Sequence, residues 1–108
     1  MDITETQSNS ATVLALGGRL DGPASPGLEQ KVDALVASGA RTIVFDCSRL
    51  DYVSSAGLRA FLTSAKKLKA AGGKAAFAAL APTVREVFEL SGFLNVLEVH
   101  SPVAAPPA

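Results

Sequence analysis

Apolar and polar positions alternate along the chain in short blocks that predict strands and helices in turn. Apolar runs of strand length, each bounded by turn residues, occur at residues 11–16, 42–45, 74–80 and 95–99. A weaker alternation at residues 3–6 predicts a short edge strand. Because only a short polar link separates this strand from the next run, we expect the first two strands to pair antiparallel.

Apolar residues recur at helical spacing in three further stretches, and each stretch ends at a glycine. In the first stretch, Ser25 is the expected N-cap and Pro26 the first helical residue. The third begins at Pro82, and the glycines that end the three helices are Gly39, Gly72 and Gly92. The order β-β-α-β-α-β-α-β predicts one α/β domain with a mixed, mostly parallel sheet over residues 1–100. The Pro- and Ala-rich tail, residues 101–108, is expected to be disordered.

The composition of the chain excludes several classes of function, although it says little more about the fold. The 108 residues carry ten basic and ten acidic side chains, so the chain lacks the basic surplus that is typical of nucleic-acid binders. A single cysteine excludes an internal disulfide, and a single histidine leaves little material for catalytic triads or metal sites. Nothing at the N-terminus resembles a signal peptide, and no apolar run is long enough to span a bilayer. We therefore expect a cytoplasmic binding or switching module without a metal or cofactor, rather than an enzyme.

Binding sites in open α/β sheets gather where the carboxyl ends of strands meet the first turns of helices. This rule selects three loops, at residues 18–25, 48–57 and 81–83. In the second loop, Ser54 and Ser55 stand where a helix is expected to begin, and the free N–H groups and dipole of a helix start favour an anion such as a phosphate. Serine is also among the commonest N-caps, so capping alone would explain the pair. With Ser54 as the cap, Ser55 would be the first helical residue and its hydroxyl would be free.

Residues 50–59 read Leu-Asp-Tyr-Val-Ser-Ser-Ala-Gly-Leu-Arg, and this stretch resembles the signature of STAS domains, the anti-sigma factor antagonist family. Two more stretches resemble landmarks of that family in the same order. They are Gly-Arg-Leu-Asp at residues 18–21 and Val-Phe-Glu-Leu-Ser-Gly-Phe at residues 87–93. The resemblance extends over most of the chain and implies a fold of the STAS type.

The resemblance also implies a function. In that family, an anti-sigma factor that is itself a serine kinase phosphorylates the serine that follows an acidic position. That serine is Ser55 here, while Ser54 replaces the acidic residue and is an alternative acceptor. The implied protein is a phosphorylation-switched binding module, which in its unmodified form binds the anti-sigma factor and releases a sigma factor for transcription. Its partners would be that kinase and a phosphatase, with no direct contact with nucleic acid or membrane, and the oligomeric state stays open between monomer and weak dimer.

The surface that the resemblance implies for partner binding combines the loop after the second strand with the start of the second helix. Its residues are Asp21, Gly22, Ser25, Ser54, Ser55, Gly57, Leu58 and Arg59. Gly57 is expected to leave room for an approaching partner, and the family fold would bring Asp21 close to Ser55. The same family contains subunits that support transporters, bacterial lipid transport included. A non-switching subunit of a membrane transporter complex is therefore the alternative function.

Overall fold

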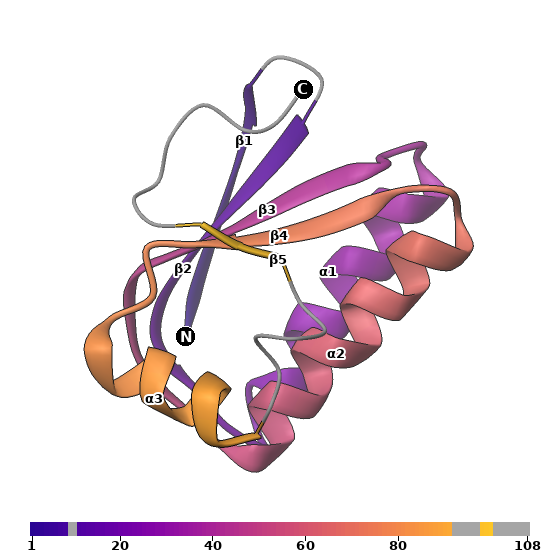
Figure 1. Cartoon of the computed structure of the whole chain (residues 1–108). Helices are drawn as coiled ribbons and strands as arrows, with labels where there is room; N and C mark the ends of the chain where they lie inside the picture. Colours follow the sequence, from indigo (N-terminus) through magenta and orange to yellow (C-terminus); the bar gives the residue numbers. More distant parts are fainter. Residues whose placement is uncertain (9–10, 92–97, 101–108) are drawn as a thin grey trace.

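Strands and helices alternate along the described residues of this computed structural model, which are 1–8, 11–91 and 98–100 (Figure 1). The elements are β1 (Asp2–Ser8), β2 (Ala11–Leu20), α1 (Ser25–Ala37), β3 (Thr42–Val53), α2 (Ser55–Ala70), β4 (Lys74–Ala78), α3 (Pro82–Ser91) and β5 (Glu98–His100). The described strands form one sheet in the order β1-β2-β3-β4-β5. β1 pairs antiparallel with β2, and all other neighbours are parallel. The predicted element order and the mixed, mostly parallel sheet are confirmed.

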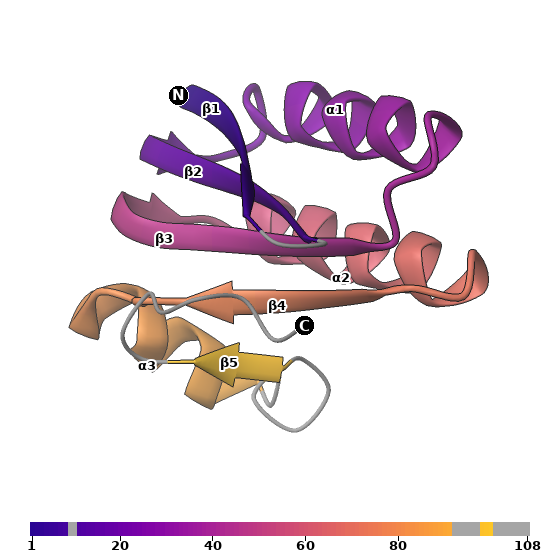
Figure 2. The same ribbon diagram turned by 90° about the horizontal axis from the view of Figure 1, so that it is seen from above.

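All three helices contribute to one core on a single face of the sheet. α1 and α2 lie side by side along that face, and α3 packs against β3 (Figure 1, Figure 2). The buried residues of this core come from the three helices and from β2, β3 and β4. Because side chains alternate between the faces of a strand, the other face carries a separate, smaller cluster. Its members are Ala11, Val44, Ala76 and Ala78, with Val13 packed against them.

Four phenylalanines fasten α2 and α3 to the sheet. Phe45 and Phe77 are register partners on β3 and β4, and their rings stack with centroids 4.8 Å apart. Phe61 from α2 meets Phe77 edge to face at 4.8 Å, and Phe88 from α3 lies 5.9 Å from both of these rings. All four side chains are fully buried. Such ring pairs add about 0.5–1.5 kcal/mol each beyond the burial of their area, so the cluster holds α2 in place against the sheet.

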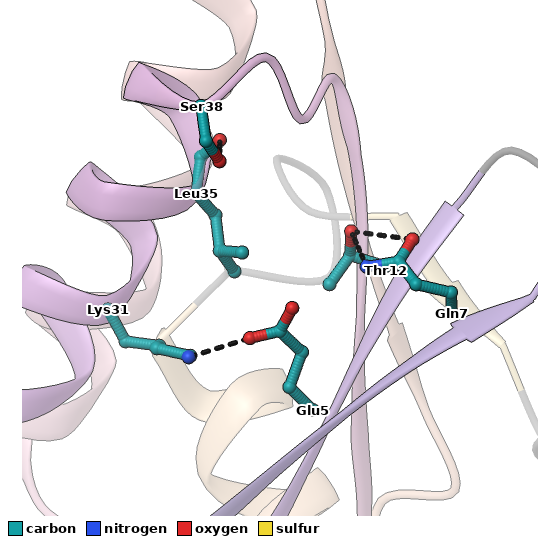
Figure 3. Close-up of polar contacts among 6 residues, drawn as sticks. All are labelled: Glu5, Gln7, Thr12, Lys31, Leu35 and Ser38. Carbon is teal, nitrogen blue, oxygen red and sulfur yellow. Dashed lines mark hydrogen bonds and ion pairs between the residues drawn. The ribbon is translucent and has the colours of Figure 1, made fainter.

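Polar contacts tie the edge strand β1 to its neighbours (Figure 3). The Lys31 ammonium on α1 lies 2.6 Å from the Glu5 carboxylate on β1, and its hydrogen bond lowers the pKa of Glu5. The side-chain amide of Gln7 donates to the Thr12 hydroxyl on β2 at 3.0 Å. β1 runs from Asp2 to Ser8, so it is longer than the strand predicted at residues 3–6.

The predicted loop at residues 48–57 is mostly strand. β3 continues to Val53 and pairs with β2, which itself runs past Gly18 to Leu20. Two register shifts interrupt this pairing, and Gly18 takes a φ of 95°, which favours glycine. Such bulges break the alternation of period two by which a half-buried strand is identified. The polar stretch at the end of β3 therefore resembled a loop in the sequence.

The last predicted elements lie partly outside the described residues. α3 begins at Pro82 as predicted, but the glycine expected to end it, Gly92, lies outside. β5 is described at Glu98–His100, so only part of the predicted strand at residues 95–99 can be compared. The tail at residues 101–108 also lies outside, and its disorder stays a prediction.

Candidate functional site

Ser54 connects β3 directly to α2 and caps the helix. Its backbone is extended, with φ −83° and ψ 175°, and its hydroxyl oxygen accepts the Gly57 N–H at 3.1 Å. Its own N–H donates to the Leu20 carbonyl oxygen at 2.9 Å, and its carbonyl oxygen accepts the Leu58 N–H at 2.9 Å. The prediction that Ser54 is the N-cap is confirmed. Both backbone groups and the side-chain oxygen of Ser54 thus hold the junction between β2, β3 and α2 in one conformation.

Ser55 is the first residue of α2, and it is exposed. Within the described part of the chain, its hydroxyl has no hydrogen-bond partner. The Ser54 hydroxyl, in contrast, belongs to a half-buried residue and already serves the helix start. Of the two serines singled out by the sequence, Ser55 is therefore the one that is exposed and whose hydroxyl has no partner among the described residues.

Gly57 and Leu58 lie beneath the surface. A Cβ atom at Gly57 would overlap the Leu20 carbonyl oxygen and come within 2.9 Å of Leu20 Cγ and 3.1 Å of Val53 Cγ1. The missing side chain thus lets α2 approach the end of β2 closely enough for the bond between Ser54 and Leu20. The room at Gly57 is therefore filled by Leu20 and Val53, and not left for a partner as predicted. Leu58 is only 6% exposed and belongs to the core. The exposed members of the predicted partner surface are Gly22, Ser55 and Arg59.

Asp21 organises the turn that leads into α1. A carboxylate oxygen of Asp21 accepts the Ala24 N–H at 3.2 Å, and its carbonyl oxygen accepts the N–H and the hydroxyl of Ser25 at 3.0 and 2.7 Å. The prediction of Ser25 as N-cap is wrong, because Asp21 engages its hydroxyl and Ser25 is buried as the first residue of α1. Ala24 stands at the cap position without a side-chain bond. Since Leu20 bonds to Ser54, this turn lies beside the start of α2.

An aromatic–arginine pair that was not predicted from the sequence lies next to this junction. Arg19 and Tyr52 are register partners on β2 and β3, and the Arg19 guanidinium carbon lies 4.1 Å from the centroid of the Tyr52 ring. Tyr52 is 40% exposed, and an open hollow of about 490 Å³ lies along Arg19. Exposed Tyr and Arg are side chains in which protein interfaces are enriched. The hollow is lined by Met1, Gly18, Arg19, Asp21, Pro23 and Ala24.

Features that would indicate other kinds of site are missing from the described residues. No three His, Cys, Asp or Glu side chains in this part of the chain are grouped so that they could hold a metal ion. Cys47 is fully buried, and burial raises the pKa of its thiol, so its thiolate is not readily formed. None of the described helices is both long and apolar enough to cross a membrane.

Two substitutions at Ser54 test its role as the N-cap of α2. Alanine removes the oxygen that accepts the Gly57 N–H, and aspartate keeps an acceptor oxygen but has no hydroxyl. We expect Ser54→Ala to lower the free energy of unfolding by about 1 kcal/mol, because the Gly57 N–H loses its acceptor. Ser54→Asp should unfold with nearly the parent free energy, since a carboxylate oxygen accepts the same N–H and suits the positive end of the helix dipole. Urea denaturation followed by circular dichroism measures both variants. An unchanged free energy of unfolding in Ser54→Ala would show that the cap bond does not stabilise the fold, and a loss in Ser54→Asp equal to that in Ser54→Ala would show that a carboxylate does not replace the hydroxyl.

Known proteins are similar to this sequence over most of its length. The sequence pattern of the STAS domain matches residues 2–105. BtrV of Bordetella bronchiseptica, named as a candidate anti-sigma factor antagonist, is 40% identical over 99 residues, which are 92% of this chain and 85% of BtrV. The anti-sigma F factor antagonist of Lysinibacillus sphaericus is 29% identical over 89 residues, or 82% and 76% of the two chains.

The fold is shared as well. The Bacillus cell fate determinant SpoIIAA, solved in its phosphorylated form, matches with a TM-score of 0.71 and 25% identity over 91% of this chain and 90% of SpoIIAA. Anti-sigma factor antagonists of this kind are binding modules and not enzymes. The match to the domain pattern over almost the whole sequence, the identity with BtrV and the common fold show that this chain belongs to the STAS domain family of anti-sigma factor antagonists.

Proposed function

We propose that this chain binds an anti-sigma factor through the face around Ser55, and that phosphorylation of Ser55 ends the complex. The anti-sigma factor would itself be the serine kinase, and a phosphatase would restore the unmodified form. Release of the sigma factor, and with it transcription, would then depend on unmodified Ser55, and all partners would meet in the cytoplasm. The observation that carries this proposal is the exposed Ser55 hydroxyl, without a partner among the described residues, at the start of α2.

The electrostatics of a phosphate support such a switch. Phosphorylation would add about −1.5 to −2 charges at neutral pH to a side chain that is neutral before the reaction. In a complex this charge would be buried against the partner, and the loss of water from a charge that is not fully neutralised costs several kcal/mol. SpoIIAA, whose fold this chain shares, has been solved in a phosphorylated form. A single phosphate on this face is therefore sufficient, in energetic terms, to change the choice of partner.

The geometry of the junction favours Ser55 over Ser54 as the acceptor. A phosphate on Ser54 would have to be built on the oxygen that accepts the Gly57 N–H, at a half-buried position. The Ser55 hydroxyl has no hydrogen-bond partner among the described residues, so a phosphate on it would displace no bond of the helix start. The family's usual acidic residue and Ser54 have one property in common, which is that Asp and Ser are both strong N-caps. The replacement therefore keeps the start of α2 intact.

Intact mass after incubation with ATP and the anti-sigma factor kinase of the same organism tests the proposal. We expect one phosphate on the parent chain and one on Ser54→Asp, which lacks the Ser54 hydroxyl but keeps a cap. Ser55→Ala should gain none. Phosphate on Ser55→Ala but not on Ser54→Asp would move the acceptor to Ser54. No phosphate on any of the three chains would overturn the switch.

A further inference from the structure

We infer that Arg59 is the counter-ion of a phosphate on Ser55, so that the modified side chain is held by its own helix. This inference rests on the proposed phosphorylation of Ser55. Both residues are exposed on α2, Ser55 as the first residue and Arg59 four positions later. Side chains at positions i and i+4 lie one above the other on a helix, with about 5–6 Å between their Cβ atoms. A phosphate on Ser55 would therefore stand within reach of the Arg59 guanidinium.

The Arg59 guanidinium is free to take this role. The ion pairs found among the described residues are Lys31–Glu5, Lys67–Asp33 and Arg85–Glu89. Arg59 belongs to none of them. The positions one turn away from it on α2 hold Ser55, Ala56, Leu62 and Thr63. No carboxylate on this helix therefore competes with a phosphate for the guanidinium.

The start of α2 alone offers a phosphate only part of what it needs. In the first turn, the Gly57 N–H is taken by the Ser54 hydroxyl oxygen, and the Leu58 N–H by the Ser54 carbonyl oxygen. A guanidinium supplies several further donors, and their planar arrangement suits two phosphate oxygens at once. The order along the helix is also the favourable one, because an acid four residues before a base pairs better than the reverse. Arg59 thus completes a phosphate environment that the helix start only begins.

The pairing has a consequence for the proposed switch. A phosphoserine on an exposed helix end can rotate freely, so its charge would be spread over many positions in the solvent. Held by Arg59, the phosphate would lie over the first turn of α2 and present its oxygens at one place on the face around Ser55. A partner that docks on this face would then meet the phosphate at this place more often than in a chain without Arg59.

Phosphoserine inserted at position 55 during translation of the full chain tests the pairing without any kinase. Arg59→Gln removes the charge, and Arg59→Lys keeps the charge but loses the planar set of donors. Lys66→Gln is the matched control, because Lys66 is an exposed cation on the same helix but lies several turns beyond Ser55. Phosphorus NMR during a pH titration gives the pKa of the phosphate in each chain.

With Arg59 in place, we expect the phosphate to titrate below the second pKa of about 6 that is ordinary for phosphoserine, because a nearby cation favours the dianion. Arg59→Gln should raise that pKa by about 0.15–0.4, which corresponds to about 0.2–0.5 kcal/mol for a surface ion pair between positions i and i+4. Arg59→Lys should give an intermediate pKa, and Lys66→Gln should leave it unchanged. The melting temperature of the phosphorylated chain should also fall by roughly 2 °C more in Arg59→Gln than that of the unphosphorylated chain.

An unchanged phosphate pKa in Arg59→Gln, or an equal rise in Lys66→Gln, would overturn the pairing. Failure of the proposed function would look different. In that case the kinase would leave Ser55 unmodified, or the phosphorylated chain would still bind the anti-sigma factor. Neither result depends on what the titration shows, so the two failures are distinguishable.

Discussion

A glutamate at position 55 is expected to weaken binding of the anti-sigma factor by about a hundredfold or more, which corresponds to about 2.7 kcal/mol. The carboxylate brings a negative charge to an exposed point at the start of α2. In the proposed complex this charge and the Arg59 guanidinium would both lose water, and that loss costs more than their pairing returns. The free energy of unfolding should change by less than about 1 kcal/mol, because an acid in the first turn of a helix is mildly favourable. Binding and folding would therefore respond very differently to the same substitution.

Ala34→Glu is the matched control for this experiment. Ala34 is exposed in the later turns of α1, so the same charge is added to a helix surface away from the start of α2. Isothermal titration calorimetry with the purified anti-sigma factor compares the dissociation constants, and thermal unfolding checks each variant. Parent affinity in Ser55→Glu would refute the charge mechanism. An equal loss in Ala34→Glu would mean that net charge, and not the position of the charge, weakens the complex.

Gly57→Ala should lower the free energy of unfolding by about 2–4 kcal/mol, and the melting temperature by roughly 10 °C or more. The added Cβ would overlap the Leu20 carbonyl oxygen and press on the side chains of Leu20 and Val53. The same oxygen accepts the Ser54 N–H, so relief of the overlap would stretch that bond as well. Backbone cannot yield as easily as the end of a flexible side chain, and overpacking of this kind is among the costlier substitutions.

Gly27→Ala provides a control of opposite sign. Gly27 and Gly57 are each the third residue of a helix, α1 and α2 respectively. A Cβ at Gly27 meets nothing within 4 Å, so alanine there should raise the free energy of unfolding by about 0.5–1 kcal/mol through its better helix propensity. Chemical denaturation of both variants measures the difference. Similar changes in the two chains would mean that the contact between Gly57 and Leu20 is not tightly packed.

Short-range rules predicted the elements of this fold well. Pro82 begins α3, and α1 ends just before Gly39, because proline and glycine act on the backbone of their own neighbourhood. Ser54 could be assigned as a cap for the same reason, since its partner is the N–H of Gly57, three residues later. In each case the sequence stretch contains all the groups that take part in the interaction.

Features that depend on a distant partner could not be predicted in this way. β3 continues through Tyr52 because β2 supplies hydrogen-bond partners across two register shifts, and residues 48–53 alone carry no sign of them. The stacking of Arg19 on Tyr52 was missed for the same reason. Ser25 looked like a cap, but the Asp21 carbonyl oxygen takes its hydroxyl. The packing of Gly57 on Leu20 likewise became visible only once the ends of β2 and α2 were placed together.

The junction between β3 and α2, which are linked by one residue, contains residues that stabilise the fold next to residues that are exposed on the surface. Ser54 and Gly57 are committed inward, to Leu20 and to each other, whereas Ser55 and Arg59 face outward from the same helix turns. Under the proposed function, substitutions on the outward positions are therefore expected to alter recognition while the scaffold keeps its stability. A cell that holds several such antagonists could diversify these few positions to insulate one signalling pair from another.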